Sequence, residues 1–215
     1  MRVETTKEMK KLNTLVLGFA VAMGLSSCIK DGDQFDPAAQ FELERPIVRA
    51  YAEANLGNPR FHEETGIWYE VVAPGDGAYQ YKLVSNPNNP SNRVIEAPDI
   101  TVIYTGTLVE TDVVVESNDD DGGDKKSLGN VPAAWQFAFL PEEILYDEDG
   151  ELLDEPIKFA NSGGLTEEGL TAGSVIRIVS PSFYIYGNQS VGSVPANSPM
   201  YYEIEVVAIE APDAD

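Results

Sequence analysis

From residue 65 to residue 209, short segments rich in β-branched and aromatic residues alternate with short turn-forming segments. This alternation predicts strands at 67–72, 79–84, 100–108, 112–115, 135–140, 175–179 and 200–209. Segments 86–92 and 118–126 are expected to be loops, and only the residues around 167–170 suggest a short helix here. Many short strands with one short helix predict an α+β domain built on an antiparallel sheet.

A helical extension is predicted ahead of this sheet, at residues 36–60. Asp36 and Pro37 form a helix-start pattern, with Asp as N-cap and Pro at the first helical position. Apolar residues at helical spacing follow: Phe41, Ile47, Val48, Tyr51 and Ala52. Pro46 is expected to kink or split the helix. The sequence leaves open whether this segment is a spacer, a dimer contact or a lid.

Residues 1–27 have the pattern of a secretory signal. Lys10 and Lys11 precede an apolar stretch at 15–24, which is well short of the ~20 residues that span a bilayer. Directly behind it, Leu25-Ser26-Ser27-Cys28 resembles a lipobox, and Cys28 is the only cysteine in the chain. We therefore predict a lipoprotein signal peptide and lipidation of Cys28, which leaves no thiol for a disulfide.

Residues 28–35 are predicted to be a polar tether behind the lipid. Lys30-Asp31-Gly32-Asp33 resembles the Lys-acidic signals of some surface lipoproteins, although a plain solvated tether accounts for it equally well. The expected location is the cell envelope, lipid-anchored in the outer membrane, on either the periplasmic face or the cell surface. The oligomeric state is left open.

The charge of the chain excludes one class of partner. The net charge is −22, and the signal segment carries four basic and two acidic residues, so the chain without it is near −24. Binding nucleic acid through phosphates needs a basic face, so no nucleic-acid partner is expected. An acidic surface is also repelled by anionic headgroups, so the lipid must supply the membrane attachment.

Several short motifs follow one another within residues 61–211: TGIWY at 65–69, PGDG at 74–77, VIYTGTL at 102–108, SP…YG at 180–187, VPANSPM at 194–200 and YEIEV at 202–206. Together they resemble the motifs of the FKBP-type peptidyl-prolyl isomerases. The resemblance implies an FKBP-like antiparallel sheet wrapped around a short helix, with proline-containing polypeptides as partners and no cofactor.

The same resemblance implies a set of site residues. Tyr104 would form one wall of a proline pocket, Tyr186 would donate its hydroxyl to the substrate carbonyl, and Glu116 would stand for the family's acid. Further contacts would come from Phe137 (or Phe139), Val194 at the rim and Tyr202 at the base. Such a pocket needs no nucleophile, because stripping water from an X-Pro amide favours the twisted state in which resonance is weaker.

Departures from the family pattern predict a weak catalyst. The family's Phe-Asp pair falls on 115–116 or on 114–115, so a ring is lost in either register and the acid survives only in the first. The Trp expected before the short helix is missing, because 162–165 reads SGGL, and the segment 141–159 is longer than expected. The sequence thus leaves open an isomerase or folding factor for exported proteins, a non-catalytic peptide- or protein-binding lipoprotein, or a purely structural envelope protein.

Two acidic clusters and one histidine suggest other chemistry only weakly. The segment 147–150 has part of a calcium-loop pattern, but Leu145 and Pro156 stand where its first and last ligands belong. The carboxylates of 118–124 have no defined spacing, so both clusters are expected to be solvated turns, with no metal site. His62, the single histidine, is expected to be a solvated loop residue.

Overall fold

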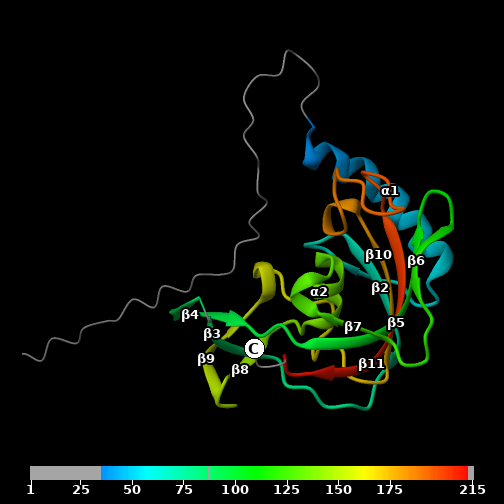
Figure 1. The fold of residues 1–215 in the computed structure, drawn as a ribbon. Helices are drawn as coiled ribbons and strands as arrows, with labels where there is room; N and C mark the ends of the chain where they lie inside the picture. The colour runs from blue at the N-terminus through cyan, green and yellow to red at the C-terminus, as the bar shows by residue number, and fades with distance from the viewer. Residues whose placement is uncertain (1–34, 87, 213–215) are drawn as a thin grey trace, which may run out of the picture.

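The computed structural model describes residues 35–86 and 88–212. Cys28, the predicted signal peptide and all of the tether except Phe35 lie outside the described residues. A seven-stranded sheet dominates the structure (Figure 1), and every pair in it is antiparallel. Its strands, in spatial order, are β1 (Arg60–His62), β2 (Ile67–Pro74), β10 (Ser174–Ser180), β11 (Met200–Glu210), β5 (Asp99–Leu108) and β6 (Val113–Asn118), with β7 (Asp124–Ser127) also paired to β5.

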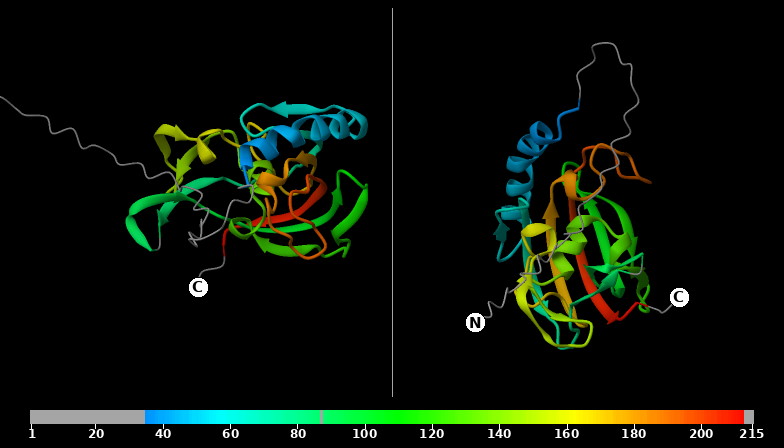
Figure 2. Two further views of the ribbon diagram at one scale, coloured as in Figure 1. Left: turned by 90° about the horizontal axis from the view of Figure 1, so that it is seen from above. Right: turned by 90° about the vertical axis from the view of Figure 1, so that its left-hand side faces the viewer.

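A second, four-stranded sheet lies to one side of the first (Figure 2). Its order is β4 (Asn89–Ile95), β3 (Lys82–Asn86), β8 (Ile144–Asp147) and β9 (Leu152–Ile157), with β3 and β8 parallel. The expected loops at 86–92 and 118–126 thus contain the starts of β4 and β7. The extra length of 141–159 forms the hairpin of β8 and β9.

The short helix of the domain is α2 (Ala133–Phe139), so the predicted strand at 135–140 is wrong. Five of its seven residues are buried, and a helix buried on nearly all sides loses the 3.6-residue hydrophobic period. The predicted helix at 167–170 is also wrong: this segment is a turn, in which Gly169 takes a φ of +78° and Leu170 N–H donates to the Phe139 carbonyl. Short 3₁₀ turns complete the structure: η1 (Leu128–Asn130), η2 (Phe159–Asn161) and η3 (Ser182–Tyr184).

The main core lies between α2 and the inner face of the large sheet. Fully buried side chains from four adjacent strands fill it, among them Ile67, Ile100, Ile176, Ile178 and Ile204. They belong to strands with β-branched residues facing the core, which is the pattern that predicted these strands. The arrangement is the α+β fold expected from the sequence.

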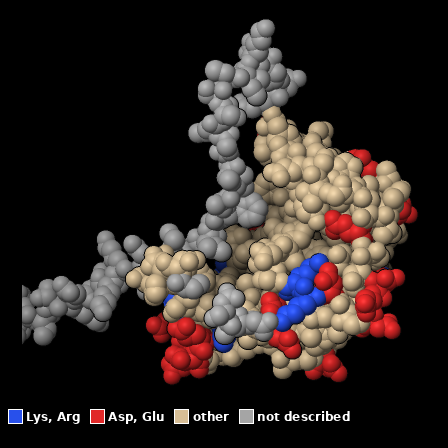
Figure 3. Space-filling model, viewed as in Figure 1, with Lys and Arg blue, Asp and Glu red and all other residues tan. Residues whose placement is uncertain are grey.

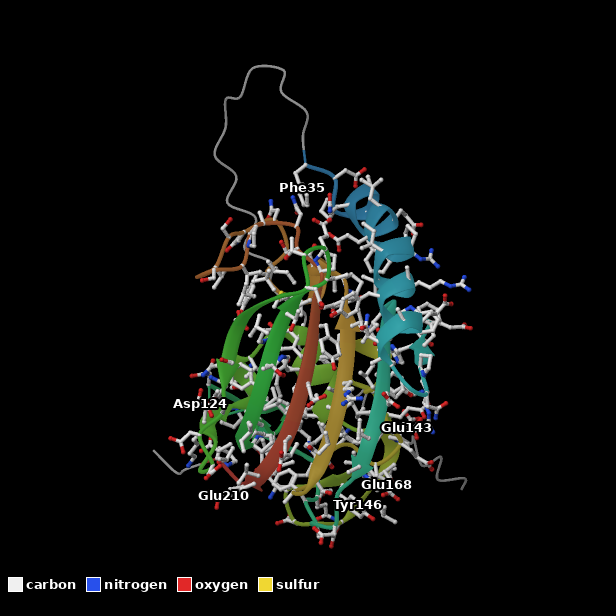
Figure 4. All side chains as sticks on the ribbon, turned by 90° about the vertical axis from the view of Figure 1, so that its right-hand side faces the viewer. Phe35, Asp124, Glu143, Tyr146, Glu168 and Glu210 are labelled. Atoms are coloured by element: carbon white, nitrogen blue, oxygen red, sulfur yellow. The ribbon has the colours of Figure 1, made fainter. Side chains whose placement is uncertain are left out.

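Helix α1 (Pro37–Asn55) packs on the opposite face of the sheet (Figure 4). Val48 and Ala52 are buried with Val179 and the turn residue Val109, in a second apolar cluster. Of the kink or split expected at Pro46, the split is wrong, because one continuous helix runs through this residue. Pro46 lies on the exposed side of the helix, where water can hydrate the carbonyl that loses its hydrogen bond. Within the described ranges, no helix is long and apolar enough to cross a membrane.

Candidate functional site

Three aromatic rings from three elements meet at one end of α2. Trp135 on α2 lies edge to face against Tyr104 on β5, with ring centroids 4.9 Å apart, and against Tyr202 on β11 at 5.4 Å. Trp135 is 2 % exposed and Tyr202 is fully buried, whereas Tyr104 is half-buried. The expectation that this region lacks a Trp is wrong, because Trp135 fills the place between the two tyrosines.

A single carboxylate joins two of the predicted site tyrosines. Glu116 on β6 accepts the Tyr186 hydroxyl at Oε1 (2.8 Å) and the Tyr202 hydroxyl at Oε2 (2.9 Å). Burial, together with the Glu116 contact, raises the pKa of both tyrosines well above the ordinary value of 10, so both hydroxyls stay protonated donors. We call Tyr104, Glu116, Trp135, Tyr186 and Tyr202 the aromatic cluster.

A β-bulge decides which residue supplies this acid. Glu116 lies opposite Gly106, while the next paired residues are Val114 and Thr107, so Val115 is the extra residue of the bulge. The bulge thus places Glu116, and not Val115, opposite Gly106, where its carboxylate reaches the two tyrosine hydroxyls.

Gly106 explains the Tyr-Thr-Gly motif in physical terms. A Cβ at this position would lie 2.6 Å from Cε1 of Tyr202 and 3.3 Å from Cβ of Glu116. The ring of Tyr202 can therefore approach the backbone of β5 this closely only because residue 106 has no side chain. The motif thus supports the packing of the aromatic cluster.

A cation lies beside the exposed edge of the cluster. Nζ of Lys126 on β7 lies 5.3 Å from the ring centroid of Tyr104 and 2.5 Å from the carboxylate of Asp124. Burial alone would lower the pKa of Lys126, but the contacts with Asp124 and Tyr104 outweigh it and raise that pKa. Figure 3 shows a small basic patch over β7, with acidic residues around it.

Tyr186 comes from a tight turn that follows β10. The Ser182 carbonyl accepts N–H groups from both Ile185 and Gly187, which fixes the turn on either side of Tyr186. Farther along, Val191 and Val194 exchange two backbone hydrogen bonds of 3.0 and 2.9 Å. Val194, the predicted rim residue, is almost fully buried beneath this loop.

Phe137, a predicted site residue, packs against rings outside the aromatic cluster. It lies two positions after Trp135 on α2, so its ring points to a different side of the helix. There it packs against Phe159 at 4.9 Å and Tyr184 at 5.4 Å. Trp135, which was not predicted, holds the central position instead. The signal that could have found it is Pro132 followed by two alanines, a helix-start pattern.

A separate polar cavity of about 300 Å³ lies near β1. His62 borders it on β1, with its side chain 13 % exposed and its Nδ1 2.8 Å from Thr65 Oγ1, so the expectation of a solvated loop histidine is wrong. Burial lowers the pKa of His62, although Glu64 and Glu142 oppose the shift. Charges of both signs line the cavity, including the 3.1 Å ion pair between Lys158 and Glu142.

The acidic segment 147–150 forms the turn of the hairpin between β8 and β9. The Asp147 carboxylate accepts the backbone N–H groups of Asp149 and Glu151 at 3.0 and 2.9 Å, so it supports the turn itself. Within 35–86 and 88–212, no group of three or more His, Cys, Asp or Glu side chains is placed to hold a metal ion.

Comparison with known proteins shows likeness at the level of fold. No protein-family model matches the sequence, and no curated protein matches it. The structure is similar to that of FkpA from Escherichia coli, with a TM-score of 0.50, 17 % identity and coverage of 81 % of this chain. The chain spans 63 % of the length of FkpA in that structure.

Two other solved structures are also similar. A peptidyl-prolyl cis-trans isomerase from Pseudomonas syringae pv. tomato has a TM-score of 0.47 and 18 % identity, and the match covers 83 % of this chain and 99 % of that one. AtFKBP13 has a TM-score of 0.46 and 16 % identity, with coverage of 72 % and 99 % respectively. Together with the antiparallel sheet around α2, the likeness to FkpA shows that this chain has the FKBP-like α+β fold.

Proposed function

We propose that this protein binds proline-containing polypeptides at the aromatic cluster and acts as a peptidyl-prolyl cis-trans isomerase or folding factor for exported proteins. The observation that carries the proposal is that Tyr186 and Tyr202 meet at Glu116, while Trp135 packs between Tyr202 and Tyr104. These side chains come from five separate segments of the chain. The FKBP-like fold brings them together at one place.

The cluster offers the two components that amide rotation needs. Tyr104 and Tyr186 are half-buried, so a proline ring can reach their exposed edges, while Trp135 and Tyr202 form a rigid base beneath. The Tyr186 hydroxyl keeps its proton and can donate to a substrate carbonyl. An apolar surface that removes water from the amide favours the twisted state, in which resonance is weaker.

We still expect weak turnover, but the structure replaces one of the reasons for it. The missing Trp no longer counts, since Trp135 is present. Val115 still replaces a ring, and Tyr186 donates to Glu116 until a substrate carbonyl displaces it. A hydrogen bond to a charged group is worth about 1.5–3 kcal/mol. If only ~1.4 kcal/mol of this opposes the transition state, the rate falls about tenfold.

The bond between Tyr186 and Glu116 also favours a second candidate function. A domain whose donor is held by its own carboxylate would suit a non-catalytic module that binds polypeptides, because holding a chain does not require that donor. The second sheet, formed by β4, β3, β8 and β9, gives such a module additional surface.

An isomerisation assay on prolyl peptides tests the first function, with Tyr186→Phe as the diagnostic variant. The matched control is Tyr79→Phe, which also removes a tyrosine–carboxylate bond, that of Tyr79 to Glu96 at 2.7 Å, but lies outside the cluster. We expect slow turnover that Tyr186→Phe lowers further and Tyr79→Phe leaves unchanged. Binding without turnover would favour the second function. The absence of both binding and turnover would refute both functions.

We further propose that Cys28 is lipidated and anchors the protein to the cell envelope, in the outer membrane. The support is the position of this only cysteine directly behind an apolar signal segment. Labelling cells with a fatty-acid probe should mark the protein, and Cys28→Ser should remove the mark. Equal labelling of the variant would contradict the proposal.

A further inference from the structure

Helix α1 contributes a buried carboxylate to the turn that carries Tyr186. Glu44 is 2 % exposed, and within the described part of the chain neither lysine nor arginine pairs with it. Its oxygens accept three hydrogen bonds: from Ser182 N–H at 2.7 Å, from Ser182 Oγ at 2.6 Å and from Gln40 Nε2 at 2.7 Å. Burying a carboxylate without a cation is costly, so these bonds must satisfy it.

Ser182 is the fixed point of the Tyr186 turn. Its N–H and hydroxyl donate to Glu44, while its carbonyl accepts the N–H groups of Ile185 and Gly187, on both sides of Tyr186. A displacement of Ser182 would therefore move the backbone that aims the Tyr186 hydroxyl. In this way Glu44 reaches the aromatic cluster through a short series of hydrogen bonds.

The same helix also reaches the strand that carries the acid. The Tyr51 hydroxyl, two turns after Glu44, donates to Asp112 Oδ1 at 2.8 Å. Asp112 lies just before β6, in the turn between β5 and β6, and has a φ of +56°. Glu116 follows on β6. One helix thus holds both segments whose side chains meet in the bond between Tyr186 and Glu116.

We infer that Glu44 is a positioning residue of the peptide-binding site, supported by Tyr51, and that α1 is a brace of that site. Glu44 acts through Ser182 on Tyr186 and does not itself touch the substrate. This inference rests on the proposed function, since it assigns Glu44 a role in peptide binding. It also makes a claim about the free protein: the position of Tyr186 depends on Glu44.

The free protein gives the first test. Glu44→Gln keeps the size of the side chain but leaves one acceptor oxygen for the groups that Glu44 binds. The ring NMR signals of Tyr186, assigned with Tyr186→Phe, should shift in Glu44→Gln. The matched control is Glu42→Gln, because Glu42 is an exposed glutamate of the same helix that pairs with Arg45 at 3.2 Å, and this variant should leave the Tyr186 signals in place. Unshifted Tyr186 signals in Glu44→Gln would overturn the inference, whether or not peptides bind.

Peptide binding gives the second test, with a fluorescent Ala-Leu-Pro-Phe peptide as probe. We expect Glu44→Gln to weaken binding about tenfold in the wild-type background and by less than twofold in the Tyr186→Phe background. A role confined to general stability would weaken binding equally in both backgrounds, and that additive result would overturn the inference.

Two further variants keep the inference testable if Glu44→Gln fails to fold. Ser182→Ala removes the hydroxyl bond to Glu44 but keeps the backbone one, and Tyr51→Phe removes only the contact with Asp112. Each should shift the Tyr186 signals relative to the wild type, whereas Glu42→Gln should not, and no shift in either variant would overturn the inference. If the wild type binds no prolyl peptide, the proposed function fails, while the NMR result still decides whether Glu44 positions Tyr186.

Discussion

Tyr202 and Glu116 should be strongly coupled in stability, and removing Glu116 should cost more than removing the Tyr202 hydroxyl. Tyr202 is fully buried, and its hydroxyl donates to Glu116 Oε2 at 2.9 Å. Glu116→Ala removes the acceptor and leaves a buried hydroxyl without a partner. Tyr202→Phe removes that hydroxyl and leaves Glu116, which is only partly buried, with Tyr186 and water as remaining partners.

The expected magnitudes follow from this asymmetry. An orphaned buried donor costs about 1–3 kcal/mol, and each lost bond to a charged group costs about 1.5–3 kcal/mol. Tyr186 can turn toward water, so it adds little to the first variant. We expect Glu116→Ala to lower the free energy of unfolding by about 3–4 kcal/mol and Tyr202→Phe by about 1.5 kcal/mol. The double variant should cost about as much as Tyr202→Phe plus ~1 kcal/mol for lost packing, because no hydroxyl is then orphaned.

Urea unfolding, followed by the fluorescence of Trp135 and Trp68, measures all four proteins. Glu116→Gln serves as the control, since it keeps one acceptor oxygen and should cost less than Glu116→Ala. We expect a coupling energy of about 2–3 kcal/mol between Glu116 and Tyr202. If the cost of the double variant equals the sum of the single costs, the two side chains do not depend on each other and the reasoning about the buried hydroxyl is refuted.

Three further predictions concern packing, pH and the extension. Gly106→Ala places a methyl group 2.6 Å from the buried ring of Tyr202, so it should lower the urea midpoint by an amount equivalent to about 1–3 kcal/mol, and an unchanged midpoint would contradict the close approach. Burial holds the pKa of His62 in the folded protein below its unfolded value of 6.5, so the unfolded chain takes up the proton first as the pH falls. The free energy of unfolding should therefore decrease below about pH 7. His62→Gln should lose this part of the decrease, measured as the difference between the urea midpoints at pH 8 and pH 5. A chain that starts at Asn58 lacks the buried residues of α1 and uncovers Val179, so its melting temperature should fall by many degrees, and an unchanged value would show that α1 does not stabilise the sheet.

The strands of the large sheet were predictable because their sequence pattern and their environment agree. Residues 100–108 and 200–209 alternate between the core face and the outer face over most of their length, and turn-forming residues flank them. The helical extension was predictable from its N-cap, since the Asp36 carboxylate accepts the N–H groups of Ala38 and Ala39, as the pattern implied.

Helix α2 escaped prediction for a physical reason, and one error produced another. Its buried residues lie on several sides of the helix, so large and small side chains alternate in the way they do in a strand. The family pattern places the Trp just before the short helix. Assigning that helix to 167–170 therefore moves the expected Trp position to 162–165, away from Trp135. Between α2 and residues 162–165 the chain forms β8 and β9. The pairing of β8 with β3 depends on contacts between residues distant in sequence.

The identity of the acid could be narrowed by sequence but not decided. The registers 114–115 and 115–116 differ by one residue, and the difference depends on the bulge at Val115. A bulge changes which side chains face the core without changing the composition of the strand. Tertiary packing is what places the Glu116 carboxylate at the hydroxyls of Tyr186 and Tyr202, and its role as the family's acid stays a prediction.

The tyrosine at position 202 also limits how a substrate can compete for the site. A phenylalanine there would leave Oε2 of Glu116 free for another donor, whereas the Tyr202 hydroxyl occupies Oε2 and is too deeply buried to exchange with water. Tyr186, at Oε1, is half-buried and is the only donor of the pair that can turn toward a bound peptide. If the protein acts as we propose, a substrate carbonyl draws the Tyr186 hydroxyl away from Oε1, while Tyr202 keeps Glu116 in place. Turnover that uses this donor then costs one hydrogen bond to Glu116, whereas holding a chain against the rings does not, so we expect slow turnover with binding retained.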